Sequence, residues 1–397
     1  MIPLEEARDF VLSVVQRREP VRVPVSEALG LVLAEDVASA VAIPPFANTA
    51  MDGFAVKSAD VAAAPVELAI AGTVAAGANP TTELQPGQAM RIFTGAVIPP
   101  GADAVVMVEL TEAEGDTVRV LESVPEGNHV RGAGDDVQPG DQVFSAGEVL
   151  GPGHLGVLLS LGLLEVLVYP QVRVGVVSTG DELVDDGSPL APGQIRDSNR
   201  RTLMSLVERT GAVAVDLGLA RDDEDVIEAA MRRGVAECDA VMTTGGVSMG
   251  DFDYVKAVLK RIGDMRWMQI AIKPAKPFAF GTVDGIPVFG FPGNPVSCMV
   301  SFELFGRPAL RQMTGHDPVI VPTEVAVAGG DLRRRPDGKT HFVRVAGERD
   351  ERGRMHVSMS GGQGSHMLWA MAKATALAVV PDGDGIAAGD DVDVIVL

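Results

Sequence analysis

The chain has 397 residues, enough for two to four domains, and a formal net charge of −21. This acidic balance argues against sequence-independent binding to nucleic acid or to anionic membranes, because the field of the protein has the wrong sign. Hydrophobic residues make up 46% of the chain and aromatic residues only 4%, so we expect folded domains with aliphatic cores and no extensive disorder.

Neither a secreted nor a membrane-spanning protein is indicated. Cys238 and Cys298 are too few for a disulfide framework or a four-cysteine zinc site, and their apolar surroundings favour small buried side chains over catalysis. The N-terminus lacks the apolar core of a signal peptide. The longest apolar run, residues 155–164, is far shorter than the ~20 residues of a spanning helix. We therefore expect a soluble cytoplasmic protein.

The hydrophobic pattern predicts different structure in successive parts of the chain. Apolar residues at helical spacing behind Pro3 predict an amphipathic N-terminal helix. From about 41 to 170, Val- and Ala-rich runs broken by Pro-Pro and Pro-Gly pairs predict short strands and turns. From 171 to about 315, strands alternate with capped helices, which predicts a mostly parallel sheet covered on both faces. After Pro318 the pattern predicts a small all-β domain.

Three loops follow strands of the predicted parallel sheet. Ligands of such sheets bind outside the carboxyl ends of the strands, glycine lets a backbone approach them closely, and helix N-termini offer N–H groups to anions. Each loop alone is commonplace, but three at one edge predict a phosphate-sized pocket. The candidate binding residues are Gly180, Thr244, Gly245, Gly246, Ser248, Pro292, Gly293, Asn294 and Pro295.

Acidic residues gather at the same strand ends. Carboxylates beside a phosphate pocket can hold Mg²⁺ against phosphate oxygens, and Glu182, Asp222 and Asp253 are the candidates. Each of them could instead cap a helix, and their spacing alone does not show that they converge.

Two lysines, Lys273 and Lys276, lie in a proline-stiffened segment between apolar runs, which favours anion binding over two solvent-facing lysines on an edge strand. The segments around Asp52, Thr94 and Asp136 are rich in turn formers and are ambiguous alone. The six histidines lack the spacing of zinc sites, and the sequence has no nucleophile elbow, Gly-Lys-Ser/Thr phosphate loop or dinucleotide-binding motif.

Taken in order, seven motifs resemble one enzyme family. The motifs span residues 44–53, 91–95, 178–183, 244–254, 273–277, 292–295 and 363–366. They include Asn48-Thr49-Ala50-Met51-Asp52-Gly53, Ser178-Thr179-Gly180-Asp181-Glu182-Leu183, Lys273-Pro274-Ala275-Lys276-Pro277 and Gln363-Gly364-Ser365-His366. Together they resemble the molybdopterin molybdenumtransferases, a family similar to the E domain of gephyrin, and the resemblance covers nearly the whole chain.

The resemblance implies both an architecture and a reaction. It implies insertion of molybdate into adenylylated molybdopterin with release of AMP and assistance by Mg²⁺, which would make molybdate and the pterin the substrates. It implies a discontinuous first domain of residues 1–40 and 137–170, an inserted β-rich domain of residues 41–136, a doubly wound α/β domain of residues 171–317 and a C-terminal β-barrel of residues 318–397. It also implies an elongated homodimer, and leaves open contacts with other proteins of molybdenum cofactor biosynthesis.

The same resemblance assigns residues to a cleft between two subunits. Asp52, Thr94 and Asp136 would come from the inserted domain of one subunit, and Glu182, Asp222 and Asp253 from the α/β domain of the other. Cationic and hydrogen-bonding groups for the oxyanion would be Lys273, Lys276, Arg344 and Ser365. From the residues alone, Arg344 could equally be a surface residue on a β-strand that alternates with Phe342.

The sequence departs from the family pattern at a few positions. Ala275 stands where the family usually has glycine, so backbone approach there would be tighter. Gln269 stands where some members have lysine, which removes one potential contact with molybdate. Thr49 and Phe54 replace the more usual serine and tyrosine, with little expected effect.

Two other functions remain open at this stage. One is a molybdopterin adenylyltransferase, which would correspond to the α/β segment alone and is disfavoured by the large flanking regions. The other is a non-enzymatic scaffold, since gephyrin-like proteins also cluster receptors, and a long acidic groove could bind a peptide. The retained acidic and lysine positions favour chemistry over that role.

Overall fold

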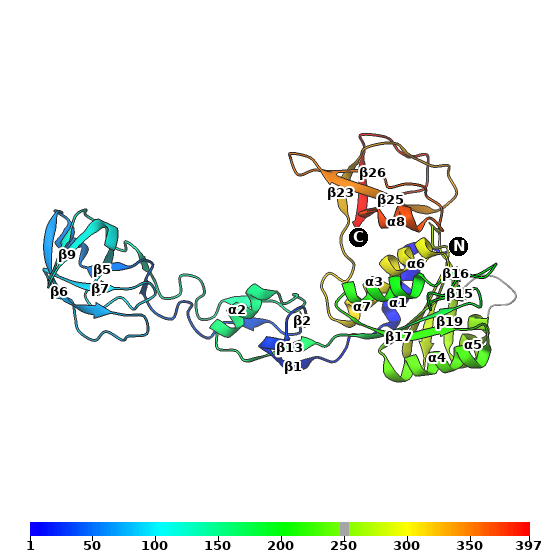
Figure 1. Ribbon diagram of the computed structural model, residues 1–397, viewed down its shortest axis with the longest axis horizontal. Helices are drawn as coiled ribbons and strands as arrows, with labels where there is room; N and C mark the ends of the chain where they lie inside the picture. Colours follow the sequence, from blue (N-terminus) through cyan, green and yellow to red (C-terminus); the bar gives the residue numbers. More distant parts are fainter. Residues whose placement is uncertain (247–253) are drawn as a thin grey trace.

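The strands form four groups along an elongated molecule in the computed structural model, which describes residues 1–246 and 254–397 (Figure 1). A distal unit lies at one end, a small linking unit follows, and a central α/β unit with a C-terminal β unit above it forms the other end. The multidomain α/β plus β class expected from the sequence is confirmed. In the described ranges, no helix combines the length and apolar character needed to cross a membrane.

The linking unit is built from two stretches of chain that enclose the distal unit in sequence. An antiparallel sheet with the order β1-β13-β2 packs against α2 through aliphatic residues such as Leu33, Leu158 and Val166. Its elements are β1 (Val21–Pro24), η1 (Val25–Glu27), β2 (Val32–Leu33), β3 (Val37–Ala38), β12 (Gln142–Phe144), α2 (Pro152–Ser160) and β13 (Glu165–Tyr169).

The distal unit contains a six-stranded sheet with the order β8-β5-β7-β6-β10-β9. Gly53 begins β5, where a Cβ would collide with the carbonyl oxygen of Val106 on β8, so the glycine after Asp52 is required by strand pairing. The elements are β4 (Asn48–Thr49), β5 (Gly53–Val56), η2 (Ser58–Val61), β6 (Val66–Val74), β7 (Gln88–Ile92), β8 (Ala104–Met107), η3 (Val108–Leu110), β9 (Thr111–Glu114), β10 (Thr117–Val120) and β11 (Val130–Arg131).

The central unit is a doubly wound sheet with the order β17-β14-β18-β22-β21-β19. The first four strands are parallel, and β21 and β19 are antiparallel to their neighbours. The strands are β14 (Arg173–Thr179), β17 (Val213–Ala220), β18 (Ala240–Thr244), β19 (Asp264–Gln269), β21 (Pro277–Val283) and β22 (Ile286–Phe291), with a small pair β15 (Leu183–Val184) and β16 (Ile195–Arg196). The helices are α1 (Leu4–Val14), α3 (Asn199–Arg209), α4 (Glu224–Glu237), α5 (Tyr254–Ile262), α6 (Pro295–Ser301), the π-helix η4 (Phe302–Gly306) and α7 (Arg307–Met313).

Both faces of this sheet are covered by helices, each over its own core. Residues of α4 and α5, including Met231 and Leu259, form one core, and residues of α1, α3 and α6 belong to the other. The second core contains stacked phenylalanines, with the rings of Phe278 and Phe305 4.2 Å apart. The expectation of purely aliphatic cores is therefore wrong here, because the few aromatic residues are concentrated in one place.

The N-terminal helix forms as expected but packs elsewhere. Ala7 and Val11 of α1 are buried in the phenylalanine-rich core of the central unit, and Ile2 bridges to Ile270. This helix of the predicted first domain, residues 1–40, thus packs its apolar face on the central unit and not on the small linking sheet.

The C-terminal unit closes into a barrel because β25 pairs with both β26 and β27. The short strand β20 (Ile272–Lys273) leaves the central unit and pairs with β25, which fixes the barrel beside the central sheet. The other elements are β23 (Glu324–Ala328), β24 (Leu332–Arg333), β25 (Thr340–Arg349), β26 (Met355–Met359), α8 (Leu368–Ala372), β27 (Ala376–Val380), β28 (Gly385–Ile386) and β29 (Asp391–Val396).

Candidate active site

Three glycine loops meet at the carboxyl edge of the central sheet. They follow β14, β18 and β22, which are neighbours in the sheet. The Gly245 N–H donates to the carbonyl of Phe291 at 3.1 Å, and a Cβ on Gly293 would lie 3.7 Å from Gly245 Cα. Gly245 and Gly246 have φ of 95° and 67°, a conformation that glycine adopts without steric cost. The predicted convergence of these loops is therefore present for Gly180, Thr244, Gly245, Gly246, Pro292, Gly293, Asn294 and Pro295, whereas Ser248 lies outside the described residues.

One asparagine joins two of these loops. The Nδ2 of Asn199, at the start of α3, donates to Thr244 Oγ1 at 2.8 Å and to the Gly293 carbonyl at 2.7 Å. Both N–H groups are therefore engaged, and the amide fixes the spacing between the loops after β18 and β22. Asn199 was not among the predicted site residues, and its position at the start of a helix after a strand was the available signal.

The chain after β14 is held by a buried arginine. The Arg200 side chain is 3% exposed and forms ion pairs with Asp185, Asp197 and Asp216, and Asp197 also accepts from Ser178 at 2.9 Å. Burial alone would lower the pKa of Arg200, but hydrogen bonds from its guanidinium to Asp197 and Asp216 outweigh this and raise it. This cluster ties β15 and β16 to α3 and so braces the segment that carries Glu182.

Two of the three acidic candidates, Glu182 and Asp222, lie within the described residues. Asp181 and Asp222 are linked reciprocally, since each backbone N–H donates to the other carboxylate, at 3.4 and 3.2 Å. Asp223 caps α4 by accepting from the N–H groups of Asp225 and Val226, so the interpretation of Asp222 as the cap is wrong. Among the described residues, no group of three or more His, Cys, Asp or Glu side chains could hold a metal, and Asp253 lies outside those residues.

A cavity of about 990 Å³ opens between the central and C-terminal units. Its wall is lined by six formally cationic side chains and, within the described chain, by one carboxylate, Asp337. The cavity wall is therefore mostly cationic, although the net charge of the chain is −21. The cations are Lys273, Lys276, Arg333, Arg334, Arg335 and Lys339, and Ser297, His341 and Ser365 add polar groups.

The two predicted lysines face this cavity because of a turn between them. Ala275 has φ of 73° and is buried, so the chain reverses direction within the Lys273–Lys276 segment while both lysines line the wall. Neither lysine is in an ion pair with a described residue. Gln269, another departure from the family pattern, pairs on β19 with Pro277, which lines the cavity, but Gln269 itself does not line it.

Arg344 lies behind the cavity wall rather than on it. Its side chain is fully buried, and Nη2 donates to the carbonyls of Gly362 and Gly364 at 2.8 and 3.2 Å. Nε and Nη1 are buried without a partner among the described residues, and burial lowers the pKa of the guanidinium. The alternative that Arg344 is a surface residue is therefore wrong. The arginine supports the loop that brings Ser365 to the cavity, and its direct contact with a ligand stays a prediction.

The distal candidates lie far from this cavity within one chain. Asp52 Oδ1 accepts from the N–H and the Oγ1 of Thr94, both at 2.7 Å, and these hydrogen bonds lower the pKa of Asp52. Both residues are exposed and belong to the distal unit, next to β5 and β7, at the end of the molecule opposite the central unit (Figure 1). Asp136 lies on the chain that leaves this unit, where its N–H donates to the carbonyl of Ile43 at 3.0 Å. One chain alone does not bring Asp52, Thr94 and Asp136 to the glycine loops.

Known proteins match the chain along its length. Three family profiles match in order: the MoeA N-terminal region (domains I and II) over residues 2–162, a probable molybdopterin-binding domain over 175–312 and the MoeA C-terminal region (domain IV) over 326–397. The molybdopterin molybdenumtransferase of Haemophilus influenzae is 38% identical over 99% of this chain and 98% of its own. The chain belongs to the molybdopterin molybdenumtransferase family.

Other members of this family support the assignment. Molybdopterin molybdenumtransferase 2 of Mycobacterium tuberculosis is 37% identical over 99% of both chains. The crystal structure of a molybdopterin biosynthesis MoeA protein from Pyrococcus horikoshii superimposes with a TM-score of 0.82 at 30% identity and covers both chains completely. The family predicted from the seven motifs is thus confirmed.

Some residues of the site were not found from the family motifs. Asn199, Arg200 and the basic residues between Arg333 and His341 lie outside the seven motifs. The run of three arginines before Pro336 was the one visible signal for the last group. Its proximity to Lys273 depends on the pairing of β20 with β25, which sequence patterns do not reveal.

Proposed function

We propose that this protein inserts molybdate into adenylylated molybdopterin, releases AMP and leaves molybdenum bound to the dithiolene of the pterin. The observation that carries this proposal is the cationic cavity that opens beside the glycine loops. A tetrahedral dianion requires charged or hydrogen-bonding donors, and a nucleotide phosphate requires backbone N–H groups and close approach. The chain has both in neighbouring places, and its relatives carry the corresponding name.

The residues have separate tasks in this proposal. Lys273 and Lys276 bind molybdate as point charges, and Ser365 and Ser297, which line the same cavity, add hydrogen-bonding groups. The glycine loops bind the phosphates of the organic substrate, with Asn199 holding two loops at a fixed spacing. Fixed donors stabilise charge in the reacting complex without reorganisation at the moment of reaction.

The acidic edge suits a magnesium ion by its chemistry. Mg²⁺ prefers carboxylate oxygens together with substrate phosphates, and the link between Asp181 and Asp222 keeps a carboxylate beside the Gly180 loop. Glu182 and Asp222, with Asp253, would hold the ion. When bound, it would neutralise charge on the phosphate oxygens of the leaving nucleotide.

The proposal includes a homodimer located in the cytoplasm. The distal unit, which carries Asp52 and Thr94 next to β5 and β7, lies far from the central unit within one chain (Figure 1), so a second chain must supply these residues and Asp136 if they act on the substrate. The pairing of Thr94 with Asp52 gives the distal unit a prepared, ionised carboxylate to contribute.

The decisive test is AMP release from adenylylated molybdopterin, with and without molybdate and Mg²⁺. We expect release that depends on both and that falls sharply in Lys276→Met. Lys260→Met, at an exposed lysine on α5, is the matched control and should behave as the wild type. Release that ignores molybdate, or consumption of ATP in its place, would contradict the proposed function.

The role of the acidic edge has its own paired test. Asp222→Asn should raise the Mg²⁺ concentration needed for half-maximal turnover and leave the melting temperature unchanged. Asp223→Ala should lower the melting temperature and leave the Mg²⁺ dependence unchanged, because it removes a helix cap that contributes about 0.5–2 kcal/mol of stability. Equal Mg²⁺ dependence in the wild type and Asp222→Asn would remove Asp222 from the metal site.

A further inference from the structure

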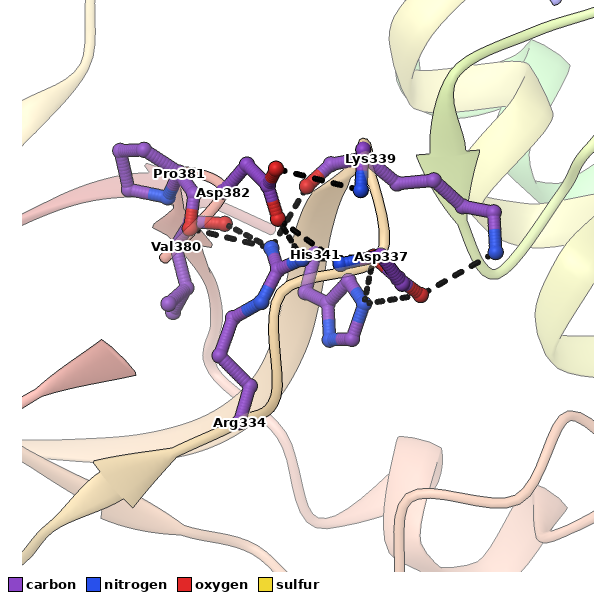
Figure 2. Close-up of polar contacts among 8 residues, drawn as sticks. Arg334, Asp337, Lys339, His341, Val380, Pro381 and Asp382 are labelled. Carbon is purple, nitrogen blue, oxygen red and sulfur yellow. Dashed lines mark hydrogen bonds and ion pairs between the residues drawn. The ribbon is translucent and has the colours of Figure 1, made fainter. Parts of the chain in front are cut away.

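The side of the cavity formed by the C-terminal unit is a loop of basic residues that the reaction described above does not use. This basic loop runs from Arg333 to His341, between β24 and β25 (Figure 2). Its framework is Arg334, whose side chain is 3% exposed. The guanidinium donates to the carboxylates of Asp337 and Asp382 at 2.6 and 2.7 Å and to the carbonyls of Lys339, Val380 and Pro381 at 2.6, 3.2 and 3.0 Å.

The donors of this loop converge on one carboxylate. Asp337 accepts from Arg334 Nη2, from Lys339 Nζ at 3.1 Å and from His341 Nε2 at 3.2 Å (Figure 2). Burial would raise the pKa of Asp337, but the hydrogen bonds from Lys339 and His341 outweigh it and lower the pKa to about 2. The carboxylate is thus ionised at physiological pH and occupies donors that would suit an oxyanion.

The lysines that the central unit contributes to the cavity have no such carboxylate partner among the described residues. Lys273 and Lys276 line the cavity, and neither is in an ion pair with a residue of the described ranges. Arg335, on the basic loop itself, also lines the cavity without an ion pair in those ranges. The cavity therefore has two unpaired lysines on the side of the central unit and, on the basic loop, one unpaired arginine among cations that are already neutralised. Because Asp337 is the single carboxylate on the described wall, it is also the group that opposes an arriving anion.

We propose that the basic loop is an anion-binding element of this cavity and that Asp337 is its internal counter-ion, which an incoming tetrahedral dianion displaces. The ligand class rests on the proposed function, whose substrates offer two such groups: free molybdate and the phosphate ester of the pterin. Either would gain Lys339 and His341 as donors when Asp337 gives them up. Arg334 would stay in place, since Asp382 and three carbonyls still hold it.

The test compares anion binding by the full-length protein in calorimetric titrations at low ionic strength. Asp337→Asn should tighten binding about 3- to 10-fold, because a partly exposed like charge is worth on the order of 1 kcal/mol. The matched control is Asp391→Asn, which removes an exposed, ion-paired carboxylate from the same barrel but away from the cavity. Asp337→Glu keeps the charge and should restore wild-type affinity.

A second pair of variants tests the unpaired arginine of the basic loop. Arg335→Gln should weaken anion binding by a similar factor, whereas Arg352→Gln, at an exposed turn of the same barrel, should not. If Asp337→Asn fails to fold, this pair decides the question. Wild-type affinity in Arg335→Gln, or an effect of Asp337→Asn no larger than that of Asp391→Asn, would overturn the proposal.

The two sources are separated by the probe. Molybdate and phenyl phosphate are titrated separately. A gain in Asp337→Asn for molybdate alone assigns the loop to the free oxyanion, and a gain for phenyl phosphate alone assigns it to the phosphate ester. Failure of this inference is distinct from failure of the proposed function. Molybdate-dependent AMP release with ordinary behaviour of both variant pairs removes only the basic loop, and altered binding without AMP release removes only the function.

Discussion

The cationic cavity and the distal unit differ in whether a single chain brings their residues together with the rest of the proposed site. The cavity is complete within one chain, because β20 pairs with β25 and fixes the barrel against the central sheet. The distal unit carries Asp52 and Thr94 to the far end of the molecule on a narrow link (Figure 1). The cavity can therefore be studied as a property of a single chain, whereas the proposed contribution of the distal residues can be tested only as a property of a dimer.

The largest expected effect tests whether the distal residues act in the partner. Asp52→Ala and Lys276→Met should each abolish most turnover. When the two chains are co-expressed, mixed dimers contain one intact site of two, so random pairing should restore about a quarter of wild-type activity. AMP release by the purified mixture is the measurement.

The control for this experiment places both substitutions on one chain. Mixing this double variant with either single variant should give no recovery, because every site then retains a defect. Activity of the mixture no higher than the sum of the separate variants, or a fully active species of about 41 kDa in light scattering, would show that the comparison between the two regions is wrong.

The next largest effect concerns the affinity of the cationic cavity for molybdate. Lys276→Met should weaken molybdate binding about 10- to 100-fold, because a charge-assisted contact contributes roughly 1.5–3 kcal/mol. Asp52→Ala should leave that affinity unchanged in the absence of the pterin. Equilibrium dialysis of molybdate against both variants measures the difference. Equal affinities would mean that the cavity does not hold the oxyanion by itself.

A smaller effect is expected where the loops are joined. Asn199→Ala removes two hydrogen bonds and should raise KM for the adenylylated pterin about 5- to 10-fold, with molybdate affinity unaltered. Gln312→Ala is the matched control, since Gln312 donates to the carbonyls of Leu12 and Val15 at 2.7 and 2.6 Å, remote from the cavity. Both changes should cost about 1–3 kcal/mol of stability. A KM shift in the control as well would reduce Asn199 to a general stabiliser.

The smallest effect concerns the segment that connects α7 of the central unit to β23 of the C-terminal unit. Burial, and then the charge of Arg311, lower the pKa of His316 from 6.5 to about 4. The unfolded chain takes up a proton near pH 6.5 while the folded chain does not until about pH 4, so stability falls as pH decreases through this window. His316→Gln should reduce this slope, measured by urea unfolding at several pH values. An unchanged slope would mean that the histidine is not held neutral.

Much of the fold followed from the sequence because its signals are local. The alternation of strands and helices after residue 171 and the loss of helical period after Pro318 correspond to the central sheet and the barrel. The placement of α1 did not follow, since an amphipathic helix specifies that one face is buried but not against which partner. The phenylalanine cluster was missed for the same reason, because composition averages over the chain.

The site was predictable where function depends on backbone shape. Gly245 and Pro295 mark strand ends and helix starts, and those positions meet in space as parallel strands require. Side-chain partners were harder to predict. Arg344 turned inward to carbonyls, and Asp337 became the counter-ion of a loop whose position depends on a domain contact. Such pairings depend on tertiary geometry that no residue spacing encodes.

The position of bound molybdate tests the central claim most directly. Crystals soaked in molybdate and measured at the molybdenum absorption edge should give an anomalous peak inside the cavity, within hydrogen-bond reach of Lys273 or Lys276 and of Ser365. A strong peak at the acidic edge beside Asp222, or on the distal unit, with none in the cavity would contradict the account.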